Sequence, residues 1–328
     1  MRKRNLIGIG GSAGAIPALA EMLTTFKPQA DASVFLVLHR SNESQHLKSI
    51  IEHASLLEVC EPQDGDPIRP NCLYIARPDR HMIVGENHIH LRHGARENNF
   101  RPAIDPLFRS LAVFGSTRAV AVIMSGYLDD GAAGARAVQQ SGGMVLVQDP
   151  TDAQSPDMPR AAISAIGEPD EILDAVALGG RLSTIVAEDA GEARDIDPNV
   201  KLELMVAGME RATMQTEERL GELSPYNCPD CNGVLWEIED GPMVRYRCHT
   251  GHAYTSRALA QRQDEMLERT LFDSLRAARE RVNFVRNLAE RDPVNRDSWN
   301  EKVEVYERDC ALLEHLITVR TTPSEPAD

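Results

Sequence analysis

The chain has 328 residues, of which 42% are hydrophobic and 26% are charged, so it is long enough for about two globular domains and is not a mainly disordered protein. Its 50 acidic and 35 basic residues give a net charge of −15, which argues against a nucleic-acid binder, because such a protein needs a basic surface. No apolar stretch approaches the roughly 18 residues of a membrane span, so we expect no membrane insertion. The basic start at 1–4 lacks a signal-peptide cleavage site, and we therefore predict a cytoplasmic protein.

Strand and helix patterns alternate from residue 5 to residue 186. Continuous apolar runs predict buried strands at 6–9, 33–38, 119–124 and 144–147. Helical spacing occupies 15–26, 45–53, 106–114 and 132–140. Shorter strand patterns lie at 73–75, 82–84 and 88–91, the last two joined by a hairpin turn at 85–87. This alternation predicts an α/β fold with a doubly wound, mostly parallel sheet and a β-hairpin.

The chain changes character after this α/β domain, which we assign to 1–187. We predict an acidic linker at 188–198, a connecting helix at 199–223, a zinc-ribbon-like module at 224–255, a helical hairpin at 256–320 and a polar tail at 321–328. Two helices of the hairpin carry apolar residues three or four positions apart: Leu267, Leu271, Leu275, Ala278, Val282 and Val285, then Trp299, Val303, Tyr306, Cys310, Leu313 and Ile317. Such a seam most simply closes the hairpin on itself, and a homodimer or docking of a partner's long helices are the alternatives.

A glycine-rich turn follows the first strand, with the sequence Gly8-Ile9-Gly10-Gly11-Ser12-Ala13-Gly14. It fits a relaxed dinucleotide fingerprint, a nucleophile elbow of the form G-x-S-x-G, or a loop whose serine only caps the next helix. The dinucleotide interpretation needs an acidic residue after the second strand, where this chain has His39. A NAD-dependent oxidoreductase is therefore the weakest of the three.

A nucleophilic serine needs a base and an orienting carboxylate. His39 follows the second predicted strand, and Asp129 and Asp130 follow the strand at 119–124. The carboxyl ends of parallel strands meet at one edge of a sheet, so these residues are expected near Ser12. Each residue could also have a purely structural role, since a histidine after a strand is often structural and either aspartate could cap a helix.

Several ordered segments resemble the catalytic domain of the chemotaxis protein-glutamate methylesterases of the CheB type. The matching segments are Gly10–Gly14, Val37–His39, Leu73–His81, Arg101–Ser110, Ser125–Ala132 and Met158–Ala162. The resemblance covers residues 5–186. By position it implies that Ser12 is the nucleophile, His39 the general base and acid, and Asp130 the carboxylate that orients the histidine.

The resemblance also implies the reaction and the partner. The expected activity is hydrolysis of glutamate methyl esters on methylated chemoreceptors within a phosphorelay signalling system, with release of methanol, no catalytic cofactor, and glutamine deamidation as a second activity. Ala13 and Tyr127 lie in the oxyanion and substrate region, and they replace the usual Thr and Met of the family. The chain starts almost at the first catalytic strand, so we expect no control by a receiver domain in cis. The alternative function is a signalling scaffold that uses the fold, ribbon and helices to bind partners.

A cysteine and histidine cluster follows the linker. Cys228 and Cys231 form one C-x-x-C pair, and Cys248 precedes His252 by four positions. Two such knuckles joined by a hairpin are typical of a zinc ribbon, so we predict a structural Zn²⁺ on these four residues. His249 is the alternative fourth ligand, and the remaining alternative is a set of reduced thiols without metal.

Overall fold

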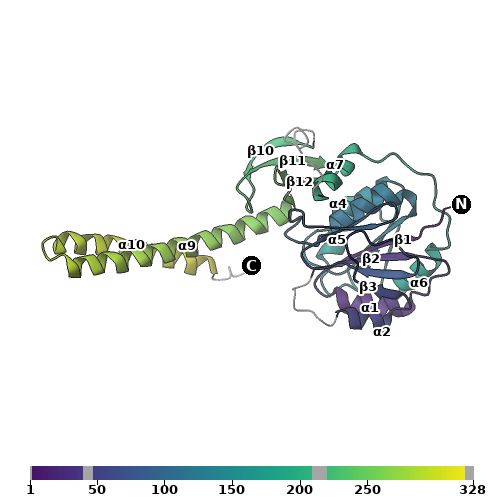
Figure 1. The fold of residues 1–328 in the computed structure, drawn as a ribbon, viewed down its shortest axis with the longest axis horizontal. Helices are drawn as coiled ribbons and strands as arrows, with labels where there is room; N and C mark the ends of the chain where they lie inside the picture. Colours follow the sequence, from purple (N-terminus) through teal and green to yellow (C-terminus); the bar gives the residue numbers. More distant parts are fainter. Residues whose placement is uncertain (1, 40–46, 209–219, 322–328) are drawn as a thin grey trace, which may run out of the picture. The chain divides into compact units, whose positions relative to one another are not determined.

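The computed structural model describes residues 2–39, 47–208 and 220–321 (Figure 1). The chain divides into two compact units, Met1–Leu259 and Ala260–Asp328. The first unit contains the α/β domain, the acidic linker and the cysteine-rich module together. The sequence predicts them as separate segments, because the buried contacts that join them leave no periodic signal.

A seven-stranded sheet forms the centre of the first unit, in the order β3-β4-β2-β1-β7-β8-β9, and all its neighbouring strands are parallel. Its strands are β1 Leu6–Gly11, β2 Ser33–Leu38, β3 Glu58–Cys60, β4 Cys72–Ile75, β7 Ala119–Ile123, β8 Met144–Gln148 and β9 Glu171–Leu173. A separate antiparallel hairpin pairs β5 His81–Val84 with β6 Ile89–Arg92. The predicted doubly wound, mostly parallel sheet with a hairpin is confirmed. The short strands β3 and β9 were not predicted.

Helices cover both faces of this sheet (Figure 1). One face packs against α1 Ala15–Thr25, α2 Leu47–Ala54 and α6 Ala175–Ile185. The other packs against α3 Ile104–Ser110, a π-turn at Leu111–Gly115, α4 Ala132–Gln140 and α5 Asp157–Ile166, and a short 3-10 turn at Ser116–Arg118 leads into β7. A Cβ at Gly10 would come within 2.4 Å of Ile104, so glycine in β1 lets the start of α3 approach the sheet closely.

The strand order decides where polar groups can meet. β1 lies between β2 and β7, so the chain leaves β1 toward one side of the sheet and later returns to its other side. The carboxyl ends of neighbouring parallel strands at such a reversal form the crevice where α/β proteins place their functional groups. The segments that follow β1, β2 and β7 therefore lie next to one another.

The C-terminal module consists of α7 and a four-stranded antiparallel sheet. The strands are β10 Glu222–Asn227, β11 Val234–Asp240, β12 Met243–Cys248 and β13 Ala253–Thr255, in that order. The helix α7 spans Pro198–Ala207. The connecting helix predicted over 199–223 therefore does not continue to residue 223, since 222–223 belong to β10. Residues 209–219 of that prediction lie outside the described residues.

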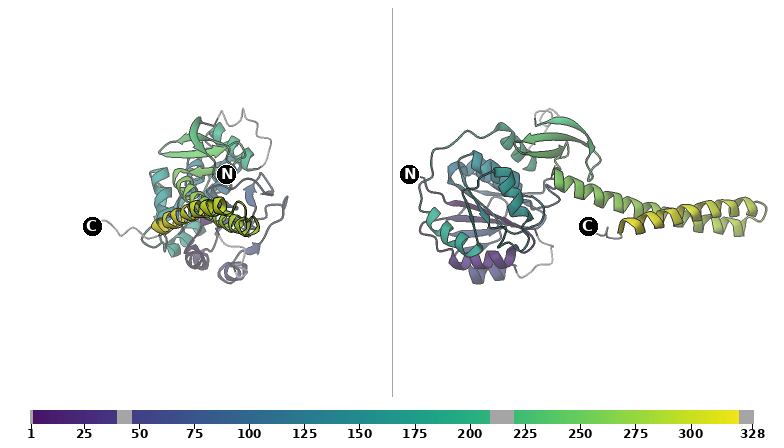
Figure 2. Two further views of the ribbon diagram at one scale, coloured as in Figure 1. Left: turned by 90° about the vertical axis from the view of Figure 1, so that its left-hand side faces the viewer. Right: turned by 180° about the vertical axis from the view of Figure 1, so that it is seen from behind.

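The second unit is the helical hairpin, formed by α10 Arg296–Thr321 and by α9 Ser256–Arg291 from residue 260 on; the two helices run side by side in the right-hand view of Figure 2. Val282 and Val285 of α9 pack with Val303 of α10. The seam is only partly buried, since Leu267 remains 42% exposed. The tail beyond 321 lies outside the described residues. None of the described helices is long and apolar enough to cross a membrane.

Candidate active site

Ser12 lies in the turn between β1 and α1, and this turn is attached to the segment after β7. The Ser12 N–H donates to the Ser125 carbonyl oxygen at 2.9 Å, and the Ser125 hydroxyl donates to the Ala13 carbonyl oxygen at 2.7 Å. A Cβ at Gly126 would lie 2.9 Å from the Cβ of Ser12 and 2.6 Å from Met158, so glycine is required for this close approach. Hydrogen bonds to the segment after β7 therefore hold the serine turn in place.

His39 follows β2, and its buried ring contacts Asp130. The His39 Nε2 lies 2.7 Å from Asp130 Oδ2, and the two side chains are 2% and 1% exposed. Phe100 stacks on the imidazole with ring centroids 3.5 Å apart and ring planes 7° from parallel, which holds the plane of the ring. His39 Nδ1 is also buried and has no hydrogen-bond partner, and no hydrogen bond joins it to Ser12 within the described part of the chain.

The Asp130 carboxylate accepts four N–H groups. Oδ2 accepts from His39 and from the Ile104 N–H (2.6 Å), and Oδ1 accepts from the Asn98 Nδ2 (2.9 Å) and the Asp105 N–H (3.3 Å). The Ile104 and Asp105 N–H groups lie at the start of α3, where backbone N–H groups have no acceptor within the helix. Burial works to raise the pKa of Asp130, but the bonds from His39, Ile104 and Asn98 outweigh it and lower the pKa below its ordinary value. Asp130 is thus ionised, and the nitrogen of His39 that faces it carries the proton.

The neighbouring aspartates have different surroundings. Asp129 accepts a hydrogen bond from the Thr255 hydroxyl at 2.6 Å, and burial raises the pKa of its carboxyl. Asp105 accepts from Asn98 at 2.9 Å, and burial together with the charge of Asp130 raises its pKa. Asp130, and neither of these two, contacts His39.

Two backbone N–H groups close to Ser12 have no acceptor in the described part of the chain. Within the described residues, the N–H groups of Ala13 and Tyr127 donate no hydrogen bond. Tyr127 presents its side chain to solvent with 62% exposed. Ala13 and Tyr127, the two residues predicted for the oxyanion and substrate region, thus lie in the segments that follow β1 and β7.

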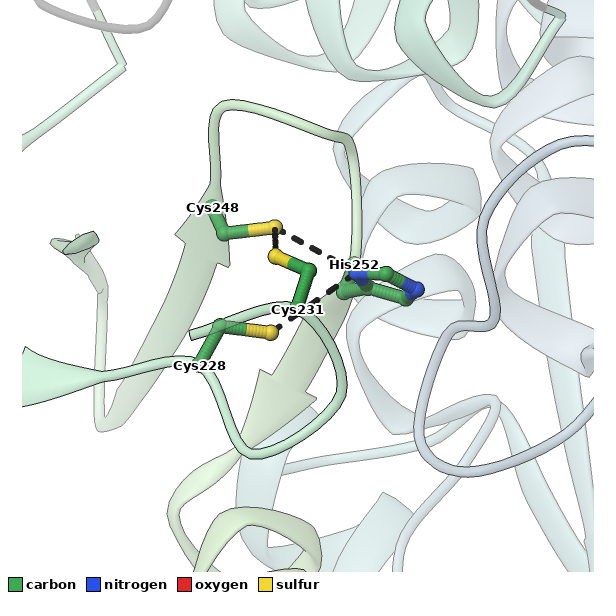
Figure 3. Close-up of side chains that lie close together, drawn as sticks. All are labelled: Cys228, Cys231, Cys248 and His252. Atoms are coloured by element: carbon green, nitrogen blue, oxygen red, sulfur yellow. Dashed lines mark hydrogen bonds between the residues drawn. The ribbon is translucent and has the colours of Figure 1, made fainter. Parts of the chain in front are cut away.

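The predicted metal ligands come together at the knuckles of the C-terminal module (Figure 3). The Sγ atoms of Cys228, Cys231 and Cys248 and a ring nitrogen of His252 all lie within 4.8 Å of one another. The Cys231–Cys248 Sγ separation is 3.6 Å, and His252 Nδ1 lies 3.4 Å from Cys248 Sγ and 3.7 Å from Cys228 Sγ. A tetrahedral zinc with Zn–S bonds of about 2.3 Å needs ligand atoms about 3.8 Å apart. The donor set and spacing therefore fit zinc.

His249, the alternative fourth ligand, is exposed and lies outside this group. The Tyr254 hydroxyl lies 3.2 Å from Cys228 Sγ, and the Thr250 hydroxyl donates to Cys231 Sγ at 3.4 Å. Such outer contacts orient ligands around a metal.

Four residues that hold the site together were not predicted from the sequence. Asn98 donates to Asp130, and Phe100 stacks on His39. Ser125 bonds to the Ser12 turn, and Thr255 bonds to Asn98 and Asp129. Asn98 and Phe100 lie just before the family-like segment at Arg101–Ser110, and Ser125 opens the segment at Ser125–Ala132, so the sequence offered a signal for these three. Thr255 carries no such signal, because its contact with Asn98 spans 157 positions.

A doubly wound parallel sheet with a serine turn and a buried histidine–aspartate pair at one edge defines the class of α/β proteins with a hydrolase-like site. The profile of the family described as CheB methylesterase matches residues 7–182, just over half of the 328 residues. The chain belongs to the CheB methylesterase family, and the predicted resemblance is confirmed.

Relatives and a solved structure agree with this assignment. The chain is 33% identical over 200 residues to the protein-glutamate methylesterase/protein-glutamine glutaminase of Pectobacterium atrosepticum, covering 59% of this chain and 55% of that one. A putative protein of the same name from Leptospira interrogans is 32% identical over 161 residues, covering 48% and 83%. The crystal structure of the Thermotoga maritima CheB methylesterase catalytic domain matches with a TM-score of 0.53 and 27% identity, covering 56% of this chain and 98% of that one.

The chain spans about half the length of several curated relatives, between 42% and 55% of each. The matched residues are those of the parallel-sheet domain. The four-stranded module and the helical hairpin lie beyond the family match, which ends at residue 182.

Proposed function

We propose that this protein is a serine hydrolase that removes methyl esters from glutamate side chains of chemoreceptor-like signalling proteins, with glutamine deamidation as a second activity. The observation that carries the proposal is the buried contact of His39 Nε2 with Asp130 Oδ2 beside the Ser12 turn. Family membership and the names of the relatives support the same reaction.

In this proposal Nδ1 of His39 is the base, since Nε2 is occupied by Asp130. Ser12 Oγ attacks the ester carbonyl carbon, and its proton passes to Nδ1. The tetrahedral intermediate collapses, the acyl–serine bond remains, and methanol leaves with the proton from Nδ1. A water molecule then gives a proton to Nδ1 and attacks the acyl carbon. When this second intermediate collapses, the bond to Ser12 Oγ breaks, Oγ takes the proton back from Nδ1, and the glutamate carboxyl is released.

The negative oxygen that forms in each step needs donors that are already in place. The unpaired N–H groups of Ala13 and Tyr127 are the proposed donors, because they lie next to the serine and bond to nothing else among the described residues. Loss of one such donor costs roughly 3–4 kcal/mol of transition-state stabilisation in well-studied proteases.

We also propose that Cys228, Cys231, Cys248 and His252 hold a structural Zn²⁺. Three thiolates and one imidazole leave no open position for a reacting molecule, which supports a structural role. The metal would stabilise a module whose apolar core is small. Homodimerisation through the C-terminal helices and a cytoplasmic location stay predictions.

The decisive experiment uses the purified chain with a chemoreceptor that carries radiolabelled methyl esters. We expect release of labelled methanol by the parent protein and by Ser49→Ala, which alters an exposed serine on α2, and no release by Ser12→Ala. Equal release by Ser12→Ala would refute the proposed nucleophile.

Absence of release by the parent would be followed by reaction with a fluorophosphonate probe. Labelling of Ser12 would then mean a different ester or amide substrate. An unlabelled Ser12 would favour the alternative of a non-catalytic signalling scaffold.

A further inference from the structure

The strand β13 lies between the four-residue metal-ligand cluster and the His39–Asp130 pair. On one side, the Tyr254 hydroxyl lies 3.2 Å from Cys228 Sγ and donates to Asp230 at 2.6 Å. On the other side, Thr255 bonds to two residues of the parallel-sheet domain. Its N–H donates to Asn98 Oδ1 at 3.0 Å, and its hydroxyl donates to Asp129 at 2.6 Å.

The side-chain amide of Asn98 joins this strand to the Asp130 carboxylate. Its Nδ2 donates to Asp130 Oδ1 and to Asp105 Oδ2, each at 2.9 Å, and its Oδ1 accepts the Thr255 N–H. Asn98 is 3% exposed and has a φ of 50°, a backbone conformation that asparagine tolerates better than most residues.

The two ends of an amide are not equivalent, because the oxygen only accepts and the nitrogen only donates hydrogen bonds. The Thr255 N–H therefore requires the amide oxygen on its side, and this turns the NH₂ group of Asn98 toward Asp130. The flipped amide would turn its oxygen toward the carboxyl groups of Asp130 and Asp105 and would leave the Thr255 N–H without its acceptor, so contacts on both sides of Asn98 favour the observed orientation.

Buried ion pairs hold β12 and α7 against the parallel-sheet domain. Glu97, the neighbour of Asn98, contacts Arg109 at 2.6 Å and Arg247 of β12 at 3.0 Å. Within the module, Glu203 of α7 contacts Arg245 at 2.7 Å and Arg247 at 3.0 Å, and it lies 3.7 Å from Arg109 of α3. All five side chains are at most 9% exposed. Buried charges are tolerated only when their partners are present, so these pairs require the module to be docked.

We propose that Asn98 is a positioning residue for the Asp130 carboxylate, and that the C-terminal module holds the Asn98 amide in place through Thr255. The inference rests on the proposed function, since it assigns Asp130 the task of holding His39. The hydrolytic site is then complete only when β13 is docked, and the module is part of the catalytic apparatus instead of a separate appendage.

The test compares Asn98→Gly with Asn99→Gly in the full chain. Both residues have positive φ, 50° and 73°, so glycine fits both without backbone strain, but only Asn98 contacts Asp130. The rate of Ser12 labelling by a fluorophosphonate reports the reactivity of the serine without a receptor substrate. We expect Asn98→Gly to lower the maximal labelling rate constant roughly 10- to 100-fold with an unchanged half-saturating probe concentration, because the reacting groups lose alignment.

Asn99→Gly should label like the parent, and thermal unfolding should show that both variants are folded. Asn98→Asp is the second variant, because its carboxyl can still accept the Thr255 N–H but offers no NH₂ group to Asp130, and we expect a fall of the same rate constant. It decides the question if Asn98→Gly does not fold.

Labelling of both variants at the parent rate would overturn the inference. An equal fall for Asn98→Gly and Asn99→Gly would also overturn it, because the effect would then belong to the turn. An unreactive Ser12 in the parent would refute the proposed function, and with it the role of Asn98.

Discussion

His39 Nε2 lies 2.7 Å from Asp130 Oδ2, and both side chains are almost completely buried. Asp130 also accepts N–H groups from the start of α3 and from Asn98, so its carboxylate is stabilised in the ionised form. An ionised carboxylate can only accept, which places the imidazole proton on Nε2 and leaves a lone pair on Nδ1. The contact thus determines which nitrogen of His39 can act as a base.

Replacing Asp130 should therefore impair catalysis far more than replacing Asp129. Asp130→Asn introduces an NH₂ group that faces donors on every side and disturbs the protonation of His39, and we expect kcat to fall about 10³- to 10⁴-fold. Asp129→Asn keeps an oxygen that can accept from Thr255. Methanol release from a methyl-esterified chemoreceptor measures both variants. A greater loss of activity for Asp129→Asn than for Asp130→Asn would show that Asp129, and not Asp130, orients the histidine.

Tyr127 should affect recognition of a large substrate more than reactivity of the serine. Its side chain is 62% exposed next to the proposed oxyanion region, and it has no hydrogen bond to another of the described residues. We expect Tyr127→Ala to raise KM for the methylated receptor severalfold while the rate of Ser12 labelling by a small fluorophosphonate stays within about twofold of the parent. A large fall in labelling would instead place Tyr127 among the residues that support the chemistry.

Metal content can be tested directly. The parent and Cys310→Ser, which alters a cysteine of α10, should each contain one zinc per chain by elemental analysis. Cys231→Ser should contain much less and should unfold at a lower temperature, because removal of a ligand withdraws binding energy from the module. Metal-free parent protein with a stable module would contradict the proposed zinc site.

The buried pair of Glu97 and Arg247 predicts a defined pH dependence of stability. Burial opposes ionisation of Glu97, but Arg109 and Arg247 lower its pKa from 4.5 to about 2. A lowered pKa in the folded state contributes stability above pH 4.5, and that contribution is lost as the pH falls from 4.5 toward 2. Glu97→Gln should therefore lower the free energy of unfolding at pH 7 by about 3–5 kcal/mol, because it leaves buried arginines uncompensated.

The difference between Glu97→Gln and the parent should shrink as the pH falls below 4.5, since the parent then loses the same charge. Urea unfolding at several pH values measures it, and the difference between the two proteins cancels any acid-induced release of metal that both share. Glu86→Gln, in the exposed turn between β5 and β6, is the control and should match the parent. A difference that stays constant down to pH 3 would refute the ionic role of Glu97.

The sequence was sufficient for the parallel-sheet domain and for the residues that follow its strands. Ser12, His39 and Asp130 each follow an apolar run, and the carboxyl ends of adjacent parallel strands must meet at one edge. The spacing of Cys228, Cys231 and Cys248 likewise predicts a pair of knuckles. These features depend on local periodicity and short spacings, which can be recognised in the sequence alone.

Only the tertiary structure decided between neighbouring candidates and joined distant segments. Whether Asp129 or Asp130 faces His39, and whether His249 or His252 faces the cysteines, depends on the direction in which a tight turn presents each side chain. The bond from Arg247 to Glu97 spans 150 positions, and the bond from Thr255 to Asn98 spans 157. Such contacts form because buried polar groups must find partners once the chain is packed, and packing brings together residues whose distance along the chain carries no periodic signal.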